Sequence, residues 1–152
     1  MSQAETGRFT VGVFPDVTWA EKGLAALGRQ GFLPEALTVI AKEGLEVAGL
    51  IQKALAKPGA KREIRDLGSV LVCGPLVDTI DGVGGDLNAV GLAAALKRAG
   101  FQAHDGRIFE TLTARGGVLV AISGEPRAAD ALATLFAFGG ANAAIGAWTG
   151  RM

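Results

Sequence analysis

Residues 7–32, GRFTVGVFPDVTWAEKGLAALGRQGF, and residues 116–140, GGVLVAISGEPRAADALATLFAFGG, carry the same order of local signals. Each contains a short apolar run rich in β-branched residues, then a turn with a proline and an acidic residue, and then an apolar-periodic segment that ends in glycine. The first pattern favours a strand and the last favours a helix. The two stretches therefore predict strand–turn–helix units in two distant parts of one chain.

The first unit begins with a predicted strand over residues 9–14. Thr18 and Glu21 have the spacing of a capping box, in which the hydroxyl and the carboxylate each accept a backbone N–H. We therefore expect a helix that starts at Thr18 and ends at Gly31, since glycine readily adopts the left-handed conformation at a helix C-terminus. A second strand is predicted over residues 36–42, which completes a βαβ unit.

The second unit repeats this order. Its predicted strand covers residues 118–123. Pro126 stands at the first helical position, where its missing N–H would have no partner in any case. Gly139 is expected to end this helix, and a weaker strand is predicted over residues 143–148.

Two βαβ units, at residues 8–42 and 116–149, predict an α+β fold. We expect a ferredoxin-like, pseudo-duplicated sheet with both crossover helices on one face. Residues 43–115 form a helical, glycine-rich insert, and the whole chain of 152 residues is expected to be a single domain. Val11 and Val120 should both be buried in central strands and point into the same core.

Inside the insert, a helix over residues 45–56 is expected to bury one apolar face, made of Leu45, Ala48, Ile51 and Leu55. A strand or an extended segment is predicted over residues 69–77. A short helix rich in alanine and leucine should end at Gly100. The last helix is expected over residues 106–115, with Asp105 as its cap.

The charge balance disfavours a nucleic-acid partner. The 15 basic and 15 acidic residues cancel, so no global field attracts an anionic polymer or membrane surface. One basic cluster has acidic residues interleaved, which is typical of a solvated loop rather than a nucleic-acid patch. Its members are Lys57, Lys61, Arg62 and Arg65, with Glu63 among them and Asp66 directly after Arg65.

Composition and the expected fold together favour self-association. Hydrophobic residues make up 49% of the chain and the net charge is zero, which gives little repulsion between copies. The 23 glycines are about twice the usual share of roughly 7%, and they permit close backbone contact. One face of a four-stranded sheet also needs cover, from the insert or from a second copy. We expect a homo-oligomer, most simply a dimer.

Targeting signals are not evident in the sequence. The polar N-terminus, MSQAETGRF, lacks the apolar segment of a secretory signal. No run of about 18 uncharged apolar residues is present, so no transmembrane segment is predicted. The one cysteine, Cys73, excludes an internal disulfide. We expect a cytoplasmic protein.

A glycine-rich turn in the insert superficially resembles a dinucleotide-binding loop. It contains Gly82, Gly84 and Gly85 and precedes an apolar helical segment. Leu87, however, stands where the motif requires a third glycine, and no clear second strand follows. We interpret the segment as a turn that leads into a buried helix, with no cofactor.

The other reactive side chains also favour structural roles. His104 is the only histidine and lies at an expected helix start, as a surface or cap residue. Cys73 lies in an apolar run, where cysteine usually behaves as a small hydrophobe. Asp78 and Asp81 lack the alternating oxygen ligands of a calcium loop. We therefore name no catalytic and no metal-binding residue.

Three segments of the chain resemble the bacterial general stress protein (heat-induced stress protein) family, which is largely uncharacterised. They are VGVFPDVTWAEKGLAALGRQGFLPEALTVIAKE at 11–43, GSVLVCGPLVDTIDG at 68–82 and IFETLTARGGVLVAISG at 108–124. The resemblance implies an opening βαβ unit, an apolar middle with a Gly-Pro step, and then a helix, a glycine pair and a strand. Acidic residues interrupt the middle of this chain, unlike that of many members. The family brings no catalytic residues.

These observations predict a non-enzymatic, cytoplasmic, stress-associated protein that acts through self-association or partner binding. The alternative is a small-molecule-binding or enzymatic ferredoxin-like protein with a pocket between the sheet and the insert. A third possibility is peripheral membrane contact through the apolar middle. The candidate interface or ligand contacts are Cys73, Gly74, Pro75, Gly82, Gly84 and Gly85.

Overall fold

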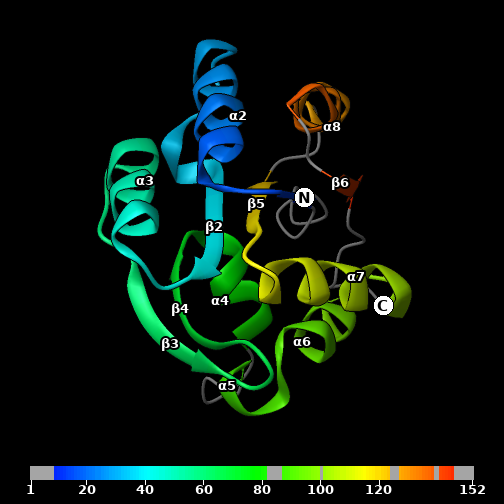
Figure 1. Ribbon diagram of the computed structural model, residues 1–152. Coiled ribbons are helices and arrows are strands. Elements are labelled where there is room, and N and C mark those ends of the chain that lie inside the picture. Colours follow the sequence, from blue (N-terminus) through cyan, green and yellow to red (C-terminus); the bar gives the residue numbers. More distant parts are fainter. Residues whose placement is uncertain (1–8, 82–86, 100, 124–126, 139–140, 146–152) are drawn as a thin grey trace.

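An antiparallel sheet separates two layers of helices in the computed structural model of the chain (Figure 1). The described residues are 9–81, 87–99, 101–123, 127–138 and 141–145. Their strands are β1 (Phe9–Phe14), β2 (Leu37–Lys42), β3 (Ala60–Ile64), β4 (Gly68–Cys73), β5 (Val118–Ser123) and β6 (Ala141–Ile145). The order across the sheet is β3-β4-β2-β5-β1-β6, and neighbouring strands are antiparallel. The predicted α+β class is confirmed.

The helices are divided between the two faces of this sheet, as Figure 1 shows. One layer consists of α2 (Val17–Arg29), α3 (Leu45–Leu55) and α8 (Ala128–Ala137). The other comes from the insert and consists of α4 (Pro75–Asp81), α5 (Leu87–Val90), α6 (Leu92–Arg98) and α7 (Ala103–Ala114). A short 3-10 helix, η1 (Pro34–Ala36), precedes β2. Among these described helices, none has the length and apolar character needed to cross a bilayer.

Helices α4–α7 of the insert therefore supply the cover that one sheet face was expected to need from the insert or from a second copy. Side chains of α4 to α7 form one buried cluster with the residues of β1, β2, β4 and β5 that point to that side. The opposite residues of these strands pack against α2, α3 and α8. Helices therefore cover both faces of the sheet, and neither face supports the expectation of self-association.

Val11 and Val120 are both fully buried in central strands, as predicted, but they face different cores. Val11 lies opposite Ala121 and points to α4–α7, whereas Val120 lies opposite Gly12 and points to α2, α3 and α8. Because side chains alternate along a strand, this register fixes the two valines on opposite faces. The expectation of one shared core is wrong.

The first helix ends as predicted but begins differently. Asp16, not Thr18, is the N-cap: the backbone N–H of Trp19 donates to Asp16 Oδ1 at 2.9 Å. The Thr18–Glu21 capping box is therefore wrong, because the earlier acceptor already satisfies this end of the helix. Gly31 follows the last turn with φ of +93°, in the left-handed region.

Two helices of the insert differ in detail from the expectation. Helix α3 turns Leu45 to solvent, with 92% of the residue exposed, and buries Val47, Leu50, Ile51 and Leu55 instead. Helix α7 starts at Ala103, with Gln102 as the N-cap residue. Asp105 therefore lies in the first turn and does not cap the helix.

A charged strand occupies the segment that was predicted to be a solvated loop. Strand β3 contains Lys61, Arg62 and Glu63 and pairs with β4 at the sheet edge. Its conformation is set by pairing with β4, because Ile64 is the only residue of the five that is fully buried. Arg62 turns toward α4 and α5, where its guanidinium reaches Asp81 at 2.7 Å and Asn88 at 2.8 Å.

Several predictions from the sequence concern residues outside the described part of the chain. Of the strand predicted at 143–148, the structure describes residues 143–145 as part of β6 (Ala141–Ile145), and residues 146–148 lie outside the described part. The same holds for Pro126, Gly139, Gly82, Gly84 and Gly85.

Replacing Val11 or Val120 with aspartate should destabilise the protein strongly, although the two side chains lie in different cores. Each variant would bury an unpaired carboxylate, which costs at least about 3 kcal/mol of unfolding free energy. Urea denaturation followed by circular dichroism measures this loss. Thr111→Asp, on the exposed side of α7, is the control. A tolerated aspartate at either valine would contradict the strand register.

Candidate functional site

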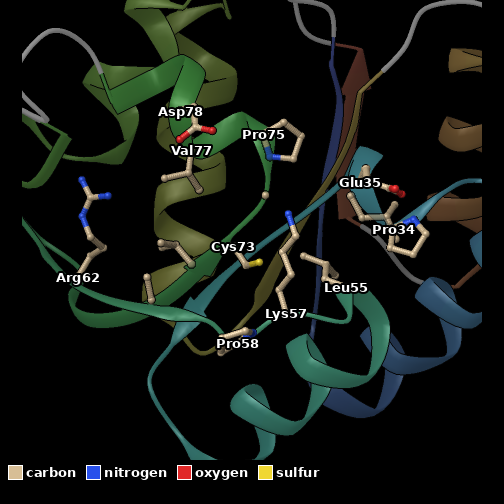
Figure 2. Close-up of a pocket in the computed structure, with 14 residues that line it drawn as sticks. Pro34, Glu35, Leu55, Lys57, Pro58, Arg62, Cys73, Pro75, Val77 and Asp78 are labelled. Atoms are coloured by element: carbon tan, nitrogen blue, oxygen red, sulfur yellow. The ribbon is translucent and has the colours of Figure 1, made fainter.

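A cavity of about 400 Å³ opens where β4 passes into α4. Its lining comes from η1, the start of β2, the end of α3, β3, β4 and α4, so that the sheet and the insert both contribute. The apolar part of the lining consists of Leu37, Leu55, Val72 and Val77. Figure 2 shows the lining side chains around this opening.

Gly74 joins the two sides of the cavity because its backbone lies directly on β2. Its φ of +122° is a conformation that residues with a side chain rarely adopt. A Cβ at this position would overlap the carbonyl oxygen of Leu37 and would lie 2.5 Å from Thr38 Cα. Glycine is therefore required at this position for two independent reasons.

Thr38 holds the start of α4 from the same side. It is fully buried in β2, and its Oγ1 accepts a hydrogen bond from the backbone N–H of Leu76 at 3.0 Å. The first turn is closed by a bond from the Val77 N–H to the Gly74 carbonyl at 3.2 Å. A buried hydroxyl and a helix N–H that would otherwise lack a partner thus satisfy each other.

Charged side chains surround the opening. Glu35, Lys57 and Asp78 are exposed and line the cavity from three different segments. Arg62 also lines it, but Arg62 is already held by Asp81, and only 20% of its side chain is exposed. The rim therefore offers both an ammonium and carboxylates to a molecule that enters.

Cys73 forms part of the cavity wall and is half-buried. Burial raises the pKa of its thiol above the ordinary value, and the nearby Lys57 ammonium opposes this shift only in part. The thiol is therefore protonated at neutral pH, and the thiolate is the nucleophilic form. The chemistry of this side chain suits contact with a bound molecule better than attack on it.

Three prolines stiffen the rim, because each fixes its own φ angle. Pro34 precedes β2, Pro58 follows α3 and Pro75 opens α4. Figure 2 shows all three around the opening. A rim built in this way is largely formed before a ligand arrives, which lowers the entropic cost of binding.

The structure brings together three of the residues that were singled out from the sequence: Cys73, Gly74 and Pro75 all line the cavity. His104 does not belong to it, since it lies on α7 and lines a separate pocket with Arg107 and Thr111.

Sequence reasoning did not connect Glu35 or Lys57 with this place, because they come from segments far from Cys73 in the chain. The clustering of prolines gave no signal either, since it exists only after folding. Within the described ranges, no group of three histidine, cysteine or acidic side chains is placed to hold a metal ion.

Comparison of the chain with known proteins does not supply a function. No family model, no curated protein and no solved structure matches it. The geometry and chemistry of the cavity are therefore the basis for the role proposed below.

Gly74→Ala should destabilise the protein far more than Gly68→Ala. Both positions have positive φ, but an added Cβ at Gly68 would meet nothing within 4 Å, so that Gly68→Ala isolates the backbone strain. We expect about 1 kcal/mol of lost stability for Gly68→Ala and at least about 3 kcal/mol for Gly74→Ala, where overlap with β2 adds to the strain. Chemical denaturation measures both values. Equal losses would mean that the contact with Leu37 and Thr38 is not tight.

Proposed function

We propose that this protein is a non-enzymatic, cytoplasmic binding protein, and that the cavity beside Cys73 is its binding site. The observation that carries the proposal is a cavity of about 400 Å³ with apolar walls and a charged rim, at the junction of the sheet and the insert. This volume lies within the usual range of small-molecule sites, roughly 300–1,000 Å³.

The side chains of the cavity favour binding over catalysis. The Cys73 thiol, whose pKa is raised by burial, is a weak nucleophile at neutral pH. The Lys57 ammonium and the carboxylates of Glu35 and Asp78 are exposed, where they can form ion pairs with a ligand. The alternative, an enzyme acting at the same cavity, would need one of these groups to transfer a proton or to attack the substrate.

We further propose that the four central strands are a ferredoxin-like pair of βαβ units. The order β2-β5-β1-β6 supports this, because it places the first strand of each unit at the centre. The packing of α2 and α8 in one cluster on the same face also supports it. In this description, β3 and β4 extend the sheet, and the insert builds the binding site at the junction.

Two further parts of the proposal rest on the sequence. The resemblance to general stress proteins supports a stress-associated role. The zero net charge and the apolar composition support a homo-oligomer. A partner that is a second copy of the chain would use a surface other than the covered sheet faces.

Native mass spectrometry of the protein purified without denaturation tests the cavity as a binding site. We expect a co-purifying small molecule that is released by unfolding. Ala60→Trp, which adds bulk to the cavity wall, should reduce its occupancy at least about tenfold, the effect of roughly 1.4 kcal/mol. Gly49→Trp is the control, since it adds the same bulk to a separate depression between α2 and α3.

The binding proposal fails if the parent carries no ligand and a library of small organic acids and amines produces no shift in its melting temperature. Equal loss of the ligand from both tryptophan variants would place the site elsewhere. His104→Ala should leave occupancy within a few-fold, because His104 does not line the cavity. Turnover of a library compound would favour the enzymatic alternative.

A further inference from the structure

Strand β3 is an outer strand of the sheet and pairs with β4 on one side. The backbone N–H and C=O groups on the free side of such a strand can pair with another strand. In Figure 1, β3 runs along the periphery of the molecule, beside α3 and away from α7 and α8. The edge of β3 is therefore a surface on which the sheet could continue.

The side chains of β3 divide between the two faces of the sheet. Lys61 and Glu63 are exposed and lie opposite Leu71 and Ser69 of β4, on the side of α3. The Ser69 hydroxyl donates a hydrogen bond to the Glu63 carboxylate. Arg62 points to the other side, toward α5. The face beside α3 thus presents one cation and one anion, two positions apart.

We propose that two copies of the chain pair through their β3 strands, antiparallel and about a twofold axis that passes between the two copies of Arg62. Residues that lie opposite each other in an antiparallel pair share a face, so an axis perpendicular to the sheet must pass midway between the two copies of one residue. An axis between the two copies of Lys61 or of Glu63 would set identical exposed charges against each other. An axis between the two copies of Arg62 sets Lys61 of each chain against Glu63 of the other, twice.

The two copies of Arg62 can face each other across the axis because the charge of each is already compensated. Its guanidinium lies 2.7 Å from Asp81 Oδ1 and donates to Asn88 Oδ1 at 2.8 Å. These bonds hold the side chain against α4 and α5 of its own chain. The arrangement reduces the repulsion between the two arginines, which is the one unfavourable pair in this register.

Self-complementarity identifies the occupant of the edge as a second copy of this chain. A twofold interface requires that one surface match itself, and the sequence Lys61-Arg62-Glu63 does so in this register. Edge charges can also have the opposite purpose, which is to keep strands apart. The two possibilities predict opposite responses to charge reversal. This inference rests on the self-association part of the proposed function, and its charged pairs, Lys61 and Glu63, do not line the cavity.

Charge reversal with mixing tests the register. Lys61→Glu alone and Glu63→Lys alone should each weaken dimerisation at least about tenfold, because each sets like charges together at both pairs. An equimolar mixture of the two variants should restore the affinity to within a few-fold. In the mixed dimer, one chain is acidic at both of these positions and the other is basic at both, so that each pair again joins opposite charges. Sedimentation velocity over a concentration series measures the dissociation constants.

Two controls accompany this experiment. Lys61 Nζ lies 3.5 Å from Glu43 Oε1 in the same chain, so Glu43→Gln tests loss of that contact alone and should leave the dimer intact. Restoration by mixing also shows that both variants are folded. Weaker pairing should appear with increasing salt, since the Lys61–Glu63 pairs are exposed.

The outcomes separate this inference from the wider proposal. A parent that is monomeric at high micromolar concentration overturns both the β3 pairing and the self-association on which it rests. A dimer that neither reversal weakens overturns the β3 interface and leaves self-association through another surface. A reversal that strengthens dimerisation would show that the charges keep the copies apart. Ligand occupancy of the cavity, measured on the same variants, should be unchanged in every case.

Discussion

The approach of Gly74 to the backbone of β2 is the contact on which the rest of this structure depends. The chain leaves the sheet at Cys73 and must turn at once into α4, which lies against the sheet face opposite α3. A side chain at Gly74 would overlap Leu37 and Thr38, and the buried Thr38 hydroxyl then fixes the first turn through the Leu76 N–H. One glycine and one hydroxyl thus set where the insert begins to cover the sheet.

The insert gives the molecule both its second layer and its candidate site. Helices α4 to α7 bury the sheet face opposite α2, α3 and α8. The cavity lies beside Gly74, at the point where the chain leaves the sheet. Strand β3 and the end of α3 form the opposite wall of this cavity. The hairpin of β3 and β4 also moves the sheet edge outward, where Lys61 and Glu63 are exposed. The proposed binding and self-association therefore use opposite faces of β3, since Ala60 and Arg62 line the cavity and Lys61 and Glu63 point to the other face.

The sequence predicted local structure well where periodicity or a glycine decided it, and less well where tertiary contacts decided it. The strands at 9–14 and 118–123 follow from apolar runs, and the helix end at Gly31 follows from glycine chemistry. Both Asp16 and Thr18 are good cap residues, so sequence could not choose between them. Strand β3 was missed because pairing with β4, and not its own side chains, makes it a strand.

The candidate site was accessible to sequence reasoning only in part. Cys73, Gly74 and Pro75 drew attention as an interruption in an apolar run, and they line the cavity. Glu35 and Lys57 could not be assigned to it, because only the fold brings η1 and the α3–β3 loop to the end of β4.

The most direct measurement of the junction between β4 and α4 is native-state hydrogen exchange at the Leu76 amide. If the Thr38 contact fixes the start of the insert, this amide should exchange as slowly as those of β5, and Thr38→Val should accelerate it at least about tenfold, roughly 1.4 kcal/mol of local stability. Exchange as fast as that of exposed amides in the parent would contradict a junction built on Gly74 and Thr38.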